Sequence, residues 1–161
     1  MFLWFAGGSF VAVWLVFRSP AVDYRLVILG ALLPLAELPI GEPRILHSLT
    51  AAVVALGLAM LLTPRRRLVQ RRLVAVPIGM FLHLLLDAVW TDTQAFWWPF
   101  AGLAWSDAAL PELARGAFGI VLEVLGAAAL WWCWQRFRLF EPARRERFLR
   151  TGQLDRDVAT P

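Results

Sequence analysis

Four side chains in this sequence have the chemistry of metal ligands and lie in or beside apolar segments. His83 and Asp87 are four residues apart in the stretch FLHLLLDAVW, so they share one face if the stretch is helical. His47 lies in ILHSLT, and Glu37 lies near the end of ILGALLPLAEL. Imidazole and carboxylate groups are the usual protein ligands of zinc, manganese and iron. Two of each would satisfy a four-coordinate centre, so the sequence predicts a divalent metal site, with zinc favoured over manganese.

The segments that must position these groups have the composition of transmembrane helices. Hydrophobic residues make up 60% of the 161 residues and the mean hydropathy is +0.62, well above the roughly 45–50% apolar content of soluble domains. Five apolar runs stand out, at residues 2–17, 25–40, 45–62, 73–90 and 117–134. A full span needs about 20 residues, so several runs must borrow flanking residues. We predict an all-α, polytopic bundle of about five spans in residues 1–135, followed by a basic cytoplasmic tail at 136–161.

The arginines predict the orientation of the bundle. Segment 63–72 carries five arginines and no acid, whereas segment 91–116 holds three acids against Arg115 alone. The positive-inside rule places segment 63–72 and the C-terminus in the cytoplasm, and segment 91–116 and the N-terminus outside. The tail could be an amphipathic helix on anionic lipid or a solvated basic end. The predicted location is a cell membrane, such as a bacterial inner or plasma membrane, crossed several times.

Composition argues against two other kinds of protein. A nucleic-acid binder would show a basic face interleaved with exposed aromatic residues, but here the arginines cluster between apolar runs. Cys133 is the only cysteine, which excludes an intramolecular disulfide and a cysteine-based zinc cluster. Membrane lipid is therefore the expected partner, with no nucleic acid.

With this orientation the four ligand candidates fall at one depth, near the outer ends of three predicted spans. A charge near mid-membrane costs at least about 2.5–3.5 kcal/mol, so such groups persist when they pair, bind an ion or carry chemistry. Glu123 lies at a similar depth in the last span, on a stripe of small residues that permits close helix approach. Glu123, Asp92 and Arg44 are candidates for the layer around the ligands. The alternative is a cluster that only hydrogen-bonds and holds the helices together.

The order of these motifs resembles the membrane-bound metal-dependent hydrolase family, small proteins also described as LexA-binding, inner-membrane-associated hydrolases. The family shows an LPD-x-D element, a His-Ser pair opening the next helix, and an H-x-x-x-D followed by a Trp-Pro-Phe-like ending. The resemblance covers about residues 26–100, and HLLLDAVWTDTQAFWWPF at 83–100 is its most specific part. It implies a distant likeness to zinc-dependent phospholipase C.

The resemblance also implies roles for individual residues. Glu37 matches the second acid of LPD-x-D, His47 matches the histidine of the His-Ser pair, and His83 and Asp87 match H-x-x-x-D. Two positions depart from the pattern. Leu35 stands at the first acid, and Glu42 stands where relatives often have an earlier histidine. These departures imply either one metal where relatives could hold two, or a chain that has lost the activity.

Two functions follow as expectations. In the first, metal-activated water attacks a lipid or envelope-related phosphoester at the outer leaflet, with Glu37 and Asp87 in catalytic roles and an amphiphilic substrate. The polar start of segment 91–116 could then form a lid over the site. In the second, the chain is a non-catalytic scaffold or regulatory protein whose polar cluster is structural.

Overall fold

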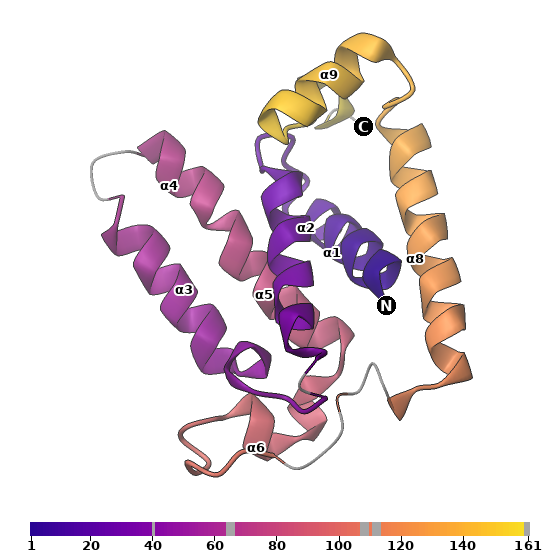
Figure 1. The fold of residues 1–161 in the computed structure, drawn as a ribbon. Helices are drawn as coiled ribbons and strands as arrows, with labels where there is room; N and C mark the ends of the chain where they lie inside the picture. Colours follow the sequence, from indigo (N-terminus) through magenta and orange to yellow (C-terminus); the bar gives the residue numbers. More distant parts are fainter. Residues whose placement is uncertain (40, 64–66, 107–109, 111–113, 160–161) are drawn as a thin grey trace.

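The computed structural model describes residues 1–39, 41–63, 67–106, 110 and 114–159, and within them every regular element is a helix (Figure 1). The α-helices are α1 (Phe2–Phe17), α2 (Tyr24–Leu32), α3 (Leu49–Leu61), α4 (Arg67–Leu73), α5 (Ala75–Leu86), α6 (Thr93–Phe96), α8 (Ala117–Arg136) and α9 (Pro142–Thr151). Short 3₁₀ turns are η1 (Leu33–Glu37), η2 (Ile45–His47), η3 (Val89–Thr91) and η4 (Arg156–Ala159). The all-α prediction is confirmed for these residues.

The predicted apolar runs match the helices, but only two helices have the length of a membrane span. Arg67–Leu86, which joins α4 to α5, and Ala117–Arg136 are each 20 residues long and apolar enough to cross a membrane. The apolar helices α1 and α3 are shorter, at 16 and 13 residues. Pro34 at the start of η1 lacks the N–H that an α-helix needs at that point, so the second run changes to a 3₁₀ turn after α2.

Some of the charges used for the orientation lie outside the described residues. These are Arg65, Arg66, Asp107 and Glu112.

Glycines bring the backbones of α2 and α5 into direct contact. A Cβ atom at Gly79 would lie 2.1 Å from the Val27 carbonyl oxygen, and one at Gly30 would lie 2.0 Å from the Val76 carbonyl oxygen. Both distances are far below van der Waals contact, so only glycine permits this crossing. The same device joins α1 to α8, where a Cβ at Gly126 would lie 2.3 Å from the Leu3 carbonyl oxygen. Small residues at helix crossings are typical of helix packing in membranes.

Polar side chains begin two of the helices that carry the site. Asp23 accepts a hydrogen bond from the Leu26 N–H at the start of α2. Ser48 accepts one from the Ala51 N–H at the start of α3. Each cap satisfies a backbone donor that the first turn leaves open, which fixes where α3 begins directly after His47.

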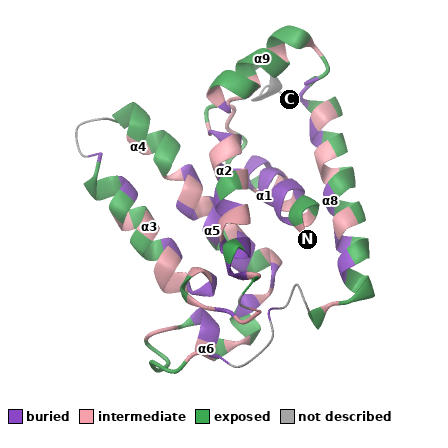
Figure 2. Ribbon diagram, viewed as in Figure 1, coloured by how far each residue is buried: buried purple, intermediate pink, exposed green. Residues whose placement is uncertain are grey.

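The outer faces of α3 and α8 are apolar and exposed (Figure 2). On α8 these residues include Phe118, Ile120, Val124 and Trp131, at 58%, 67%, 62% and 64% exposure. Extended apolar surfaces of this kind mark contact with a membrane or with another protein.

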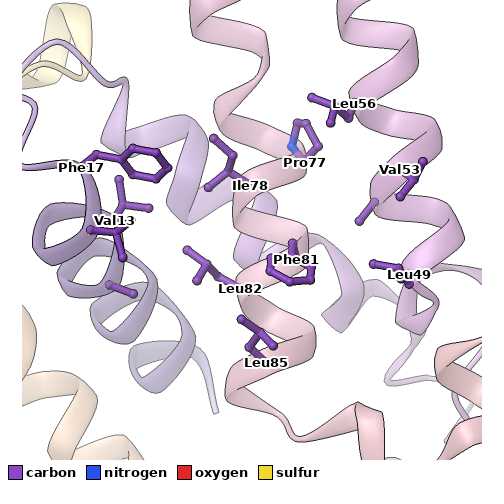
Figure 3. Close-up of a pocket in the computed structure, with 13 residues that line it drawn as sticks. Val13, Phe17, Leu49, Val53, Leu56, Pro77, Ile78, Phe81, Leu82 and Leu85 are labelled. Atoms are coloured by element: carbon purple, nitrogen blue, oxygen red, sulfur yellow. The ribbon is translucent and has the colours of Figure 1, made fainter.

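A groove of about 500 Å³ separates α3 from α1 across one face of α5 (Figure 3). Figure 3 shows Pro77, Ile78, Phe81 and Leu85 of α5 along its floor. All of the side chains that line it are apolar. His83 and Asp87 lie on the opposite side of α5, because a helix turns by about 100° per residue.

The segment after α8 folds back across the end of the bundle. Phe137, Leu139 and Leu154 are buried, and the Tyr24 N–H donates to the Gly152 carbonyl at 2.9 Å. The division into a helical domain at 1–135 and a tail at 136–161 stays a prediction. Helix α9 lies against the bundle, but none of its residues is fully buried.

Candidate metal centre

Three of the four predicted ligands meet at a single point. His47, His83 and Asp87 are buried, and each offers one ligand atom such that all three atoms lie within 4.8 Å of one another. The imidazole rings of His47 and His83 are edge to face, with ring centroids 5.2 Å apart. The residues come from η2 and from the last turn and C-cap of α5, so segments far apart in sequence build the group.

The tautomer of His83 is set by its neighbour on α2. His83 Nδ1 lies 2.7 Å from the Ala31 carbonyl oxygen. Because a carbonyl oxygen only accepts, Nδ1 carries the proton and Nε2 carries the lone pair that can bind a metal. Phe5 of α1 stacks on the His83 ring with centroids 4.0 Å apart, which holds the plane of the imidazole. The close glycine crossing of α2 and α5 places the Ala31 carbonyl of α2 within hydrogen-bond distance of His83 on α5.

Glu37 orients His47 from behind. Its Oε2 lies 2.7 Å from His47 Nδ1 and also accepts from the Arg44 N–H at 2.8 Å, while Oε1 accepts from the Leu46 N–H at 2.8 Å. A carboxylate on one ring nitrogen fixes the tautomer and raises the basicity of the other. The sequence predicted that Glu37 is the fourth metal ligand and a catalytic group. The structure instead places Glu37 beside His47, where it contacts the Nδ1 atom of that candidate ligand. Both of its oxygens are already occupied by these donors.

Arg115 holds the third ligand. Its Nη1 pairs with Asp87 Oδ1, and its Nη2 donates to the Asp87 backbone carbonyl at 2.6 Å. Asp87 is fully buried and the Arg115 side chain is 18% exposed. A guanidinium that contacts both the side chain and the backbone fixes the carboxylate rotamer. Each of the three candidate ligands therefore has a partner that fixes its orientation.

The other sequence candidates lie away from this group. Glu123 accepts from the Leu3 N–H at 2.8 Å and pairs with the Met1 amine at 3.2 Å, so it serves the start of α1. Asp92 caps α6 and accepts from Ser106. Arg44 pairs with Glu42 through its side chain, and only its backbone N–H reaches Glu37.

The segment after Asp87 forms an aromatic cap at this end of the bundle. Trp98 and Trp105 stack with centroids 4.5 Å apart, and the Arg44 guanidinium lies 5.3 Å from the Trp105 ring centroid. The Thr50 hydroxyl donates to the Trp98 carbonyl at 2.6 Å. The Thr50 contact ties Trp98, in the middle of this segment, to the first turn of α3, which follows His47 and Ser48.

The residues fit a divalent metal ion. Two imidazoles and one carboxylate are a ligand set found at zinc and non-haem iron centres, where three protein ligands leave positions for water or substrate. A purely structural site would close all four positions with protein ligands. The structure therefore brings together a donor set that could hold a divalent metal ion.

Three contributors to the site were not predicted: Arg115, the Ala31 carbonyl and Phe5. Arg115 had a signal, because it is the only basic residue in segment 91–116. The carbonyl and the stacking ring had none, since each depends on which helices become neighbours.

Comparisons with known proteins do not identify this chain. No protein-family model matches it, and neither searches of curated proteins nor searches of solved structures find a match. The case for a function therefore depends on the geometry of the residues themselves.

Proposed function

We propose that the chain is a membrane-embedded, metal-dependent hydrolase with its centre at the outer end of the helix bundle. The observation that carries the proposal is the convergence of His47, His83 and Asp87, each with its own orienting partner. Burying three ionisable side chains in a membrane costs free energy. Binding a shared metal ion would compensate for that cost.

The proposal includes an arrangement in the membrane. The chain would cross about five times, with the N-terminus outside and the C-terminus in the cytoplasm of a bacterial inner or plasma membrane. Two helices of spanning length support it. The arginine-bearing helices α4 and α9 lie toward one end of the bundle and α6 toward the other (Figure 1), which agrees with the positive-inside rule.

The chemistry follows from the ligand set. A bound zinc or manganese ion would lower the pKa of a bound water toward about 7, which supplies hydroxide at neutral pH. His47, His83 and Asp87 would hold the ion. Glu37 and Arg115 would keep His47 and Asp87 in the ligating orientation, so that little reorganisation is needed when the ion binds.

The proposed substrate is an amphiphilic phosphoester, such as a lipid or an envelope precursor. The centre lies at the end of an apolar bundle whose helices expose hydrophobic faces, so an attached aliphatic chain would remain in the membrane while the ester reaches the ion. The motif resemblance at residues 83–100 supports the same reaction class.

Elemental analysis of purified protein tests the proposal. Wild type should carry a stoichiometric divalent metal, and His83→Ala should lose it. Glu123→Gln is the matched control, because this partly exposed carboxylate pairs with the start of α1 outside the group, and it should keep the metal. Phosphodiesterase and phosphomonoesterase assays on lipid micelles should then show turnover in wild type and in Glu123→Gln, but none in His83→Ala.

The scaffold alternative predicts a different pattern. If wild type and His83→Ala both lack metal after incubation with zinc or manganese, and His83→Ala only lowers the melting temperature, the group is structural and the hydrolase proposal is wrong.

A further inference from the structure

A cavity that plays no part in the proposed function lies at the end of the bundle away from the metal centre. It has a volume of about 240 Å³ and is lined by residues of α1, α2, α8 and α9 and by Leu139. Its apolar lining is made by Phe10, Ile28, Leu130, Cys133, Trp134, Leu139, Phe148 and Leu149. One charged residue, Arg145, completes it.

Arg145 differs from its neighbours on the same helix. Arg144 pairs with Glu141 and Asp157, and Arg147 pairs with Asp155. Within the described residues Arg145 forms no ion pair, and its side chain is exposed. Its positive charge is therefore available to a ligand at the rim of the cavity.

The spacing on α9 explains how charge and cavity meet. Arg145, Phe148 and Leu149 are separated by three and four residues, so they lie on one helix face, and all three line the cavity. Arg150 lies elsewhere on the helix and does not line it. A single helix face thus presents a cation beside an apolar hollow.

The surroundings indicate a membrane ligand. Trp131, Trp132 and Trp134 end α8 beside this cavity, and tryptophan is enriched at membrane interfaces. Leu29 and Leu149 are exposed at 53% and 63%, so an apolar chain could continue along the outside of the bundle. Segment 136–150 carries six arginines against two glutamates, which attracts anionic lipid.

From these observations we infer that this cavity binds one anionic phospholipid, with an acyl chain between α2 and α8 and the phosphate on Arg145. The complementarity is that of an amphiphile: one cation for the headgroup and an apolar hollow for the chain. The inference does not depend on the metal centre, which lies at the other end of the bundle.

Native mass spectrometry of the full chain tests the inference, after reconstitution in nanodiscs that mix phosphatidylglycerol with phosphatidylcholine. Wild type should retain phosphatidylglycerol selectively. Arg145→Gln should weaken retention about tenfold, the size expected for losing a charge-assisted hydrogen bond. Arg150→Gln removes the same charge from the same helix and should retain the lipid as wild type does. Leu130→Trp, which fills the cavity, should also reduce retention.

Several outcomes would overturn the inference. Equal losses in Arg145→Gln and Arg150→Gln would indicate general surface attraction, and equal retention of the two lipids would remove the role of charge. If Leu130→Trp retains phosphatidylglycerol as wild type does, the acyl chain of the lipid does not occupy this cavity. A photoreactive phosphatidylglycerol gives an independent readout on wild type: crosslinks should fall within residues 130–149, and their absence there counts against the site.

Discussion

The two ends of this bundle use charged side chains in opposite ways. At the histidine end, His47, His83 and Asp87 are buried, and each is held by a partner that fixes its orientation. At the arginine end, α9 and the residues that follow it form ion pairs that are largely exposed, such as Arg147 with Asp155. Burial raises both the cost of a charge and the strength of its contacts. Ionisable side chains are therefore expected to control metal binding at the histidine end and to add little stability at the arginine end.

The largest effect is expected where the buried ion pair is broken. Arg115→Met leaves Asp87 buried without its guanidinium, and removing one partner of a buried pair costs about 3–5 kcal/mol. The partial exposure of Arg115 places the loss near the lower end. Unfolding should be followed with and without added zinc, because an ion that binds Asp87 would restore part of the lost stability.

If added zinc does not restore any of the stability lost in Arg115→Met, Asp87 is not a metal ligand. The double variant Arg115→Met with Asp87→Leu serves as the control, because it removes both charges and should fall close to wild type in stability.

The helix crossing behind His83 gives the next effect. Gly79→Ala inserts a Cβ against the Val27 carbonyl, which must push α5 away from α2 at a cost of about 1–3 kcal/mol. His83 should then lose its contact with Ala31 and bind metal more weakly. Thermal unfolding and metal titration measure both.

Gly57→Ala is the matched control on α3, since a Cβ there meets nothing within 4 Å. It should be neutral or stabilising by up to about 1 kcal/mol, from helix propensity alone. Equal behaviour of the two variants would mean that the crossing does not position the site.

A smaller effect is expected from the residue behind His47. Glu37→Gln preserves the size of the side chain but removes its charge, and changes of such outer partners typically weaken metal binding 10–100-fold. A competition titration with a chelator measures the affinity. Glu42→Gln, in a half-exposed ion pair with Arg44, should leave it unchanged, and an equal loss in both variants would contradict the role of Glu37.

The smallest effect belongs to the arginine end. The Arg144 guanidinium holds the pKa of the Asp157 carboxyl below its ordinary value of 3.8. A carboxyl whose pKa is lower in the folded state stabilises the fold above its ordinary pKa, and this contribution disappears as the pH falls through the lowered value. The protection factors for amide hydrogen exchange in residues 142–159, each taken relative to the intrinsic exchange rate at the same pH, should therefore be higher at pH 7 than near pH 3. Asp157→Asn should abolish that difference if this pair is its source.

The sequence predicted that His47, His83 and Asp87 lie together, but it did not predict the residues that surround them. His83 and Asp87 share a helix face as their spacing requires, and the Asp87 N–H donates to the His83 carbonyl at 2.8 Å. The predicted spans also placed His47 at the same membrane depth as His83 and Asp87. A depth gives the position of a residue along the bundle axis but leaves open which direction it faces, and this limit explains the remaining candidates.

Glu123 shows that limit most clearly. It lies on α8, and the contact between Gly126 and Leu3 packs α8 against α1, so its carboxylate meets the start of α1. Glu37 was predicted on the end of a helix, but the 3₁₀ turn at η1 places it behind His47. Pairings between helices depend on glycines and bends whose partners are far away in sequence.

The apolar groove in Figure 3 has a consequence for inhibitors. A compound lodged there would be separated from His83 and Asp87 by the full width of α5. If the chain is the hydrolase proposed above, such a compound would leave the substrate position open and would change turnover by displacing α5. For that proposed activity, compounds selected against this groove would be non-competitive modulators.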